Sequence, residues 1–212
     1  MCTRYLIELS PELRPIIEEA RRSHLTKKMT DKLGQALIAE GEVRPTDMVP
    51  VIAPDKNGLR KVFPMVWGFR FPGINHPIVN ARVETAGQKP AFRDSWQRRR
   101  CIIPASYYFE WEHIQKGNRI VPGDKYAIQT PGRQVTWLAG LYRIESLDTG
   151  FQYPVFTVLT RKPSPMLQKI HNRMPVVLPD EAVLSWICPN LSTRDIEEIA
   201  SLSITDMIAE KI

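Results

Sequence analysis

Apolar side chains near the start of the chain recur at the three- and four-residue spacing of an amphipathic helix. The pattern follows Ser10-Pro11-Glu12, in which serine suits the N-cap and proline the first helical position. The apolar positions are Leu13, Ile16, Ile17 and Ala20. A second helix is expected from about Thr30 to Ala39, ended by Gly41.

From Met48 onward the pattern becomes that of β-strands. Residues 48–53 and 59–67 are expected to form a hairpin, because the turn between them contains Asn57-Gly58. Further strands are predicted at 78–84, 101–111, 125–130, 135–144, 153–161 and 174–178, with short helices at 90–98, 163–170, 180–187 and 193–203. No linker or repeat divides the chain. The pattern predicts a single α+β domain over residues 1–212, with a curved, mostly antiparallel, barrel-like β-sheet and flanking helices.

Composition narrows the functional classes. The 212 residues include 29 Lys and Arg against 23 Asp and Glu, a net charge of +6. This balance permits nucleic-acid binding without proving it. The densest basic run, Arg98-Arg99-Arg100, fits either a DNA contact or a solvated helix end. A polar start and short apolar runs favour a soluble cytoplasmic protein that neither enters a membrane nor carries a signal peptide.

The three cysteines, Cys2, Cys101 and Cys188, are widely spaced. They form no Cys-x-x-Cys pair and no Cys/His ligand spacing, so we expect no metal site, no disulfide framework and no cofactor.

Cys2 carries the most distinctive chemistry in the chain. Removal of Met1 would give one residue both a free α-amine and a thiol, with ordinary pKa values of about 8 and about 8.5. Such an aminothiol reacts with an aldehyde in two steps: the amine forms a Schiff base, and the thiolate then closes a five-membered thiazolidine. By position alone, chance placement of one of the three cysteines is the favoured interpretation.

Three polar residues lie within or beside apolar strand segments: Asn80, Glu110 and His171. A carboxylate between Phe109 and Trp111 is costly to bury unless it is paired or protonated, so its pKa should be perturbed. Such groups recur at functional sites, although each residue could also be structural, and Glu110 could simply pair with Arg82.

Several blocks taken together resemble the SOS response-associated peptidase (SRAP) family over nearly the whole chain. They are Met1-Cys2 with Arg4, Arg44-Pro45-Thr46 leading into Val49-Pro50-Val51, Trp67-Gly68-Phe69, Asn80-Ala81-Arg82-Val83-Glu84-Thr85, the segment from Pro104 to Trp111, and His171-Asn172-Arg173-Met174-Pro175. The Asn-Ala-Arg-x-Glu block and the N-terminal cysteine are weak signals apart and specific together.

The resemblance implies an enzyme that removes its own Met1 and then crosslinks covalently to abasic sites in single-stranded DNA, shielding the lesion. It implies that Cys2 is the nucleophile and that Asn80 orients the N-terminal residue and the opened sugar. Glu110 would be the acid/base near the α-amine, and His171 would assist sugar ring opening and reversal of the crosslink. The expected partner is single-stranded DNA containing an abasic site, bound by a monomer that associates with the nucleoid when it acts on DNA.

DNA-binding residues are also expected from the matching blocks. Phosphates flanking the lesion would be held by Arg4, Arg82 and Arg173. Trp67 would stack on an exposed base unless it is ordinary core, and Pro45 with Thr46 would form a wedge beside the abasic position.

The chain departs from the family pattern at three places. Thr3 stands where glycine is common, and Asn172 follows the histidine where aspartate is frequent. Many family members continue past the last helix into a further strand segment, which this chain lacks, since it stops at Ile212 after Ser203-Ile204-Thr205-Asp206. Part of the usual sheet or DNA-binding edge is therefore expected to be absent.

Two other functions fit the residues less well. A self-processing thiol peptidase needs a cysteine and a histidine, but it would not need the cysteine at position 2. A non-covalent single-strand-binding module would leave Asn80, Glu110 and His171 structural.

Overall fold

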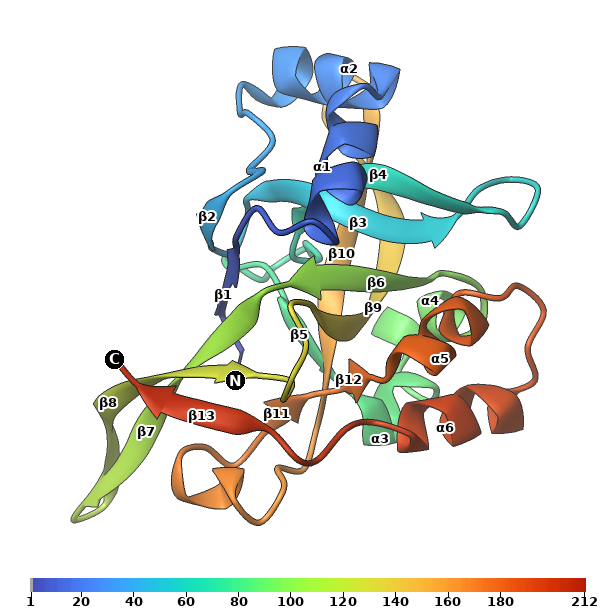
Figure 1. Ribbon diagram of the computed structural model, residues 1–212. Coiled ribbons are helices and arrows are strands. Elements are labelled where there is room, and N and C mark those ends of the chain that lie inside the picture. Colours follow the sequence, from blue (N-terminus) through green and yellow to red (C-terminus); the bar gives the residue numbers. More distant parts are fainter. Residues whose placement is uncertain (1) are drawn as a thin grey trace.

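Five strands close into a barrel in the computed structural model, which describes residues 2–212 (Figure 1). The barrel strands are β3 (Met48–Pro54), β4 (Arg60–Trp67), β6 (Arg100–Ala105), β9 (Thr136–Ser146) and β10 (Gln152–Arg161). Each pairs with its neighbour in the order β10-β4-β3-β6-β9, and β9 returns to β10. Only the β10–β4 pair of this ring is parallel. The predicted α+β fold with a mostly antiparallel, barrel-like sheet is confirmed.

Three short strands extend the barrel. β5 (Asn80–Arg82) runs parallel to β10, β11 (Met174–Pro175) pairs with β10, and β12 (Val177–Leu178) pairs with β9. The predicted strand at 78–84 is therefore shorter than expected, because the chain turns into α3 (Val83–Ala86) directly after Arg82. The predicted strand at 174–178 instead forms two short strands, β11 and β12, which pair with different strands of the barrel.

A second, antiparallel sheet has the order β13-β8-β7-β1-β2. Its strands are β1 (Arg4–Ile7), β2 (Gly41–Val43), β7 (Tyr107–Lys116), β8 (Arg119–Gln129) and β13 (Ile208–Lys211). The prediction of one strand over 101–111 is wrong, because at Ser106 the chain leaves the barrel for this sheet. The last residues of the chain form the edge strand β13 of this sheet. A strand therefore follows the last helix, although the loss of a strand segment was expected there.

Helices cover the two ends of the barrel (Figure 1). Near β3 and β4 lie α1 (Leu13–Arg21) and α2 (His24–Leu33); at the other end lie α3, α4 (Pro90–Arg98), α5 (Asp180–Trp186) and α6 (Thr193–Ser201). The apolar face predicted for the first helix is buried, as expected. No helix within residues 2–212 is long and apolar enough to cross a membrane.

Two predicted helices are displaced or reduced. The helix predicted from Thr30 to Ala39 instead begins after the N-cap Ser23, and it ends at Gly34, whose φ of 68° stops the helix. The helix predicted at 163–170 is only a short 3-10 turn, η1 (Leu167–Lys169).

One arginine of the basic run is internal. Arg100 is only 2% exposed, and its guanidinium donates to the carbonyl oxygens of Trp96, Gln97, Trp186 and Cys188 at 2.5–2.9 Å. These carbonyls lie at the C-terminal ends of α4 and α5, where helices have unpaired acceptors and a partial negative charge. Arg100 thus joins two helices to the barrel, and the expectation of a solvated helix end fails for this residue.

Replacing Arg100 with methionine should destabilise the fold by roughly 3 kcal/mol, because several inward carbonyl groups lose a charged donor. The neighbouring Arg98, whose side chain is 77% exposed, provides the matched control. Arg98→Met should change stability by less than about 0.5 kcal/mol. Urea denaturation of both variants measures the difference, and equal effects would contradict this role for Arg100.

Candidate active site

Cys2 lies in the interior immediately before β1. Its thiol donates to the carbonyl oxygen of Arg4 at 3.7 Å, and the side chain is fully buried. Burial, followed by the negative charge of Glu110, raises the pKa of the Cys2 thiol well above its ordinary value. A thiolate is therefore disfavoured until a base takes the proton. Met1, whose removal was expected, lies outside the described residues.

Asn80 binds the backbone of Cys2. Its Nδ2 donates to the carbonyl oxygen of Cys2 at 2.8 Å. The short strand β5 fixes this position, since Asn80 pairs with Val158 of β10. Its other polar atom, Oδ1, is buried and accepts no hydrogen bond from the described residues. That oxygen is available to a donor on a ligand next to Cys2.

The pairing of β1 with β7 brings Glu110 to the same place. Arg4 lies opposite Phe109 in this antiparallel pair, so the residues just before Arg4 run alongside Glu110. Glu110 is 3% exposed, and its Oε2 lies 3.9 Å from Nε2 of His171. His171, 6% exposed, follows η1 on a separate segment. Arg82 is exposed and forms no ion pair with Glu110 in the described part of the chain, which excludes that structural alternative.

Hydrogen bonding fixes the tautomer of His171. Its Nδ1 accepts the backbone N–H of Arg173 at 3.0 Å. An amide nitrogen keeps its hydrogen, so Nδ1 carries none, although the carbonyl oxygen of Arg173 lies 3.2 Å from the same atom. The proton of the neutral ring is therefore on Nε2, the nitrogen that faces Glu110.

Burial moves the pKa values of this pair in opposite directions, because it disfavours the charged form of each group. It raises the pKa of Glu110 to about 7 and lowers the pKa of His171 to about 4. At neutral pH, Glu110 populates both protonation states and His171 is uncharged. A carboxyl group that exchanges protons near pH 7 suits general acid–base catalysis, and a neutral imidazole can donate a hydrogen bond without carrying charge.

Two tyrosines beneath the site were not singled out from the sequence. Tyr5 and Tyr108 are cross-strand partners in the β1–β7 pair, and both are fully buried. Neither hydroxyl has a hydrogen-bond partner among residues 2–212. Burial, followed by the charge of Cys2, raises the pKa of both phenols. The two hydroxyl groups thus add polar atoms to the core near the Cys2 thiol. The sequence around Tyr5 and Tyr108 does not distinguish them from ordinary aromatic core residues.

Arg4 belongs to a cationic surface beside the site. It forms an ion pair with Glu42, which also binds Arg44 at 3.1 Å and Lys125 at 3.4 Å. The guanidinium carbon of Arg4 lies 5.9 Å from the ring centre of Trp111, and Nζ of Lys125 lies 5.5 Å from it. Trp111 is half-buried and lies one residue after Glu110, so this surface adjoins the site.

Trp67 is not at this surface, and its predicted stacking on a base is corrected. The side chain is fully buried, its ring stacks on Phe156 at 5.9 Å, and its Nε1 donates to the carbonyl oxygen of Val79. A base cannot reach this ring, so the core alternative is right. The indole that adjoins Glu110 is that of Trp111. Side chains alternate along β7, so an inward Glu110 would have predicted an outward Trp111 from the sequence.

The predicted wedge loop holds a strained residue. Thr46 has φ of 76°, in the left-handed region that β-branched residues rarely adopt. It is held there because its N–H donates to the carbonyl oxygen of Trp67, while the Asp47 side chain accepts the N–H of Arg44. Pro45 is half-buried and Thr46 is exposed. The loop is thus fixed in position and open to a ligand at its tip.

The two remaining predicted DNA-binding arginines differ. Arg82 is exposed at the end of β5. Arg173 has a side chain only 11% exposed, and both of its terminal nitrogens bind Glu84 at 2.8 Å. These hydrogen bonds from Arg173 lower the pKa of Glu84. The guanidinium of Arg173 is therefore already occupied within the protein, whereas that of Arg82 faces solvent.

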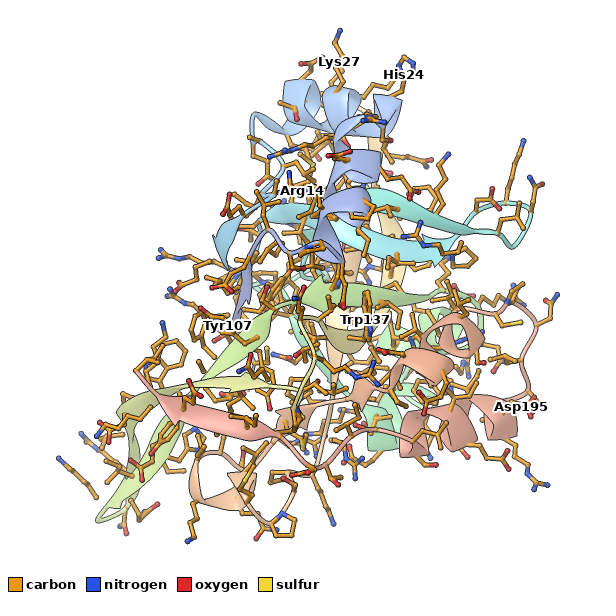
Figure 2. The ribbon with its side chains drawn as sticks, viewed as in Figure 1. Arg14, His24, Lys27, Tyr107, Trp137 and Asp195 are labelled. Carbon is orange, nitrogen blue, oxygen red and sulfur yellow. The ribbon has the colours of Figure 1, made fainter. Side chains whose placement is uncertain are left out.

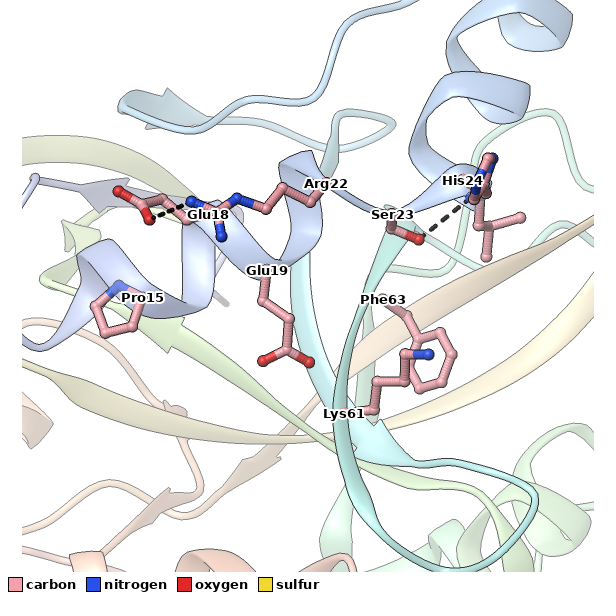
Figure 3. A pocket seen from close by; sticks show the side chains of 9 residues that line it. Pro15, Glu18, Glu19, Arg22, Ser23, His24, Lys61 and Phe63 are labelled. Carbon is pink, nitrogen blue, oxygen red and sulfur yellow. Dashed lines mark hydrogen bonds and ion pairs between the residues drawn. The ribbon is translucent and has the colours of Figure 1, made fainter.

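A groove of about 610 Å³ opens in front of Asn80. Its lining includes Asn80, Arg82, Lys89 and the half-buried Phe71. A larger hollow of about 710 Å³ lies between α1, the start of α2 and β4 (Figure 3), and it contains none of the predicted site residues. Within residues 2–212, no three metal-ligating side chains lie close enough together to hold an ion. Of the four predicted catalytic residues, only Asn80 lines this groove.

Comparisons with known proteins identify the family and the fold. The sequence pattern of the family described as "SOS response associated peptidase (SRAP)" matches residues 1–211. The abasic site processing protein YoqW of Bacillus subtilis is 31% identical over 171 residues, covering 74% of this chain and 73% of YoqW. YedK of Escherichia coli, also named an abasic site processing protein, is 31% identical over 140 residues, covering 65% and 60%. A crystal structure from Bacteroides thetaiotaomicron shares the fold, with a TM-score of 0.76, 24% identity, and coverage of 100% and 92%.

Replacing Glu110 with glutamine should change how stability depends on pH. Glu110 has a raised pKa in the folded state, so it stabilises the fold less and less as pH rises from about 4.5 to about 7. Glu110→Gln removes this penalty, which is on the order of 3 kcal/mol at most. The stability of the variant minus that of wild type should therefore be greater at pH 8 than at pH 5. Thermal unfolding at both values tests this, with the exposed Glu197→Gln as control; parallel profiles for all three proteins would contradict it.

Proposed function

Because the chain belongs to the SOS response associated peptidase (SRAP) family, we propose that it captures abasic sites in single-stranded DNA through Cys2. The substrate is supported by relatives named abasic site processing proteins. The observation that carries the proposal is the convergence of three polar groups at the start of the chain. Asn80 binds the backbone of Cys2. The negative charge of Glu110, which faces His171, raises the pKa of the Cys2 thiol.

The chemistry begins with hydrolytic removal of Met1. The free α-amine of Cys2 then attacks the aldehyde of the opened abasic sugar, and the resulting carbinolamine loses water to give a Schiff base. The Cys2 sulfur adds to the imine carbon as its proton passes to a base, which closes a thiazolidine. Ring closure removes the imine, whose neighbouring acidic protons would otherwise permit β-elimination and strand cleavage.

Each site residue has a role that its geometry supports. Glu110 carries protons between the amine, the carbinolamine and the buried thiol, since its pKa lies near neutrality. His171 donates from Nε2 to the sugar oxygen as the ring opens, with Glu110 on the same side. Asn80 holds the carbonyl of Cys2 with Nδ2 and accepts from the opened sugar with Oδ1.

The surface around the site suits a DNA backbone. Arg82 and Lys89 in the groove offer charge to phosphates on one side of Asn80, and Arg4 with Lys125 offers charge on the other side of the site. The fixed tip at Thr46 would occupy the space left by the missing base. Such contacts read the backbone and the absence of a base, so sequence preference should be weak.

The two alternatives are less well supported. In a thiol peptidase the cysteine would bind a histidine that activates it, but the Cys2 thiol binds the carbonyl oxygen of Arg4, and Nε2 of His171 faces Glu110. A purely non-covalent module would not need an acidic residue with a pKa of about 7 beside the N-terminal cysteine.

The covalent step is tested with an oligonucleotide that carries one abasic site. Wild type should give a band stable to heat and detergent, at the mass of protein without methionine plus DNA less water. Cys2→Ala should lose this band, because no thiol can close the ring, yet borohydride should still trap its Schiff base.

Cys188→Ala is the matched control, since Cys188 is an exposed thiol far along the chain, and it should crosslink normally. An undiminished crosslink in Cys2→Ala would overturn the assignment of the nucleophile. No covalent product from protein verified to lack Met1 would reject the crosslinking function.

The two tryptophans give a second test. Trp111→Ala should weaken binding to single-stranded DNA by about 1–3 kcal/mol, because a stacking surface beside the site is lost. Its melting temperature should change little. Trp67→Ala should instead lower the stability by about 3–5 kcal/mol, because it leaves a cavity in the core. Fluorescence anisotropy and thermal unfolding separate the two effects, and a Trp111→Ala variant with unchanged affinity would remove Trp111 from the DNA surface.

A further inference from the structure

A second histidine, His113 of β7, lies against the site where the pairing of β7 with β8 is irregular. The pairing of β7 with β8 shifts register between Trp111 and His113. In a regular strand, Glu110 and His113 would face opposite sides of the sheet, because side chains alternate. The register shift places two residues of β8, Gly123 and Asp124, opposite the single residue Glu112, so the bulge is on β8. Beside this irregularity, both Glu110 and His113 meet His171. Bulges of this kind redirect side chains and are common beside active sites.

His113 packs directly on the ring of His171. The two ring centres are 3.9 Å apart, and the planes are inclined by 55°. The backbone N–H of His113 also donates to the carbonyl oxygen of Ile170 at 2.9 Å, which ties β7 to the residue just before His171. The imidazole of His171 is therefore held at its Nδ1 edge by Arg173 and on its face by His113.

Exposure to solvent increases from Glu110 and His171 to His113. The side chains of Glu110 and His171 are only 4% and 7% exposed, whereas His113 is exposed. His113 thus stands between His171 and the solvent. Asn172, the residue next to His171 in the chain, is itself exposed.

We propose that His113 is a positioning residue for His171, which shields its ring from water and keeps Nε2–H directed at Glu110. The proposal rests on the function proposed above for its catalytic consequence, but the contact itself can be tested without DNA. Among the groups that act on His171, Glu110 and His113 come from β7, and Arg173 comes from its own segment. After burial, the positive charges of the α-amino group, His113 and Arg173 all lower the pKa of His171.

The test is an NMR titration of the four histidines in Met-trimmed protein, from pH 8 to pH 4. Wild-type His171 should stay neutral with its proton on Nε2 until close to pH 4. His113→Ala should raise the pKa of His171 by about one unit, because both a shield and a positive charge are lost. His113→Phe keeps a ring in place, so it should shift the pKa less.

His24→Ala is the control, because His24 extends from α2 at the far end of the molecule (Figure 2). It should leave the titration of His171 unchanged. An identical pKa of His171 in wild type and His113→Ala would overturn the proposal. If His113→Ala crosslinks more slowly and His113→Phe restores the rate, the role of His113 extends to catalysis. If wild type does not crosslink, the proposed function fails, and the titration alone decides the role of His113.

Discussion

The antiparallel pairing of β1 with β7 is the constraint on which the site depends. It ties the start of the chain to a strand more than a hundred residues away and sets Arg4 opposite Phe109. That register places Cys2 beside Glu110, and the hydrogen bond from Asn80 then fixes the carbonyl group of Cys2. A shift of one residue would turn Glu110 to the opposite face of the sheet. The reactive terminus is therefore located by a sheet rather than by a flexible tail.

Burial provides the chemistry that this geometry uses. The same low-polarity surroundings favour a protonated Glu110, a neutral His171 and a protonated Cys2 thiol, because each charged form loses hydration. Glu110 reaches a pKa suited to proton exchange at neutral pH, while His171 becomes a neutral donor. The thiol depends on a neighbouring base for its reactivity. One physical effect thus gives three different roles to three neighbouring groups.

The functional surface combines strain, charge and aromatic rings outside the barrel. Thr46 holds an unfavourable backbone conformation because both sides of its loop are bonded to fixed neighbours. Glu42 forms ion pairs with Arg4, Arg44 and Lys125. Burial raises the pKa of Glu42, but these cations, which hydrogen-bond to it or lie close by, keep that pKa below its ordinary value. Trp111 lies beneath two of the cations. Apart from the Glu42–Arg44 contact, these contacts join segments that are distant in sequence, so they depend on the closed fold.

The sequence by itself determined the α+β class and most strands, because hydrophobic periodicity is a local signal, and rare residue combinations singled out Cys2, Asn80, Glu110 and His171 as candidates. It misplaced the second helix, since Gly34 ends that helix through a positive φ that periodicity does not register. It also joined β6 to β7, since the change of sheet at Ser106 leaves the apolar pattern unbroken. Only the tertiary structure decided that Trp67 is core and Trp111 is surface, that Arg100 joins two helices, and that His113 meets His171. Burial and contact between distant segments arise only when the chain closes on itself.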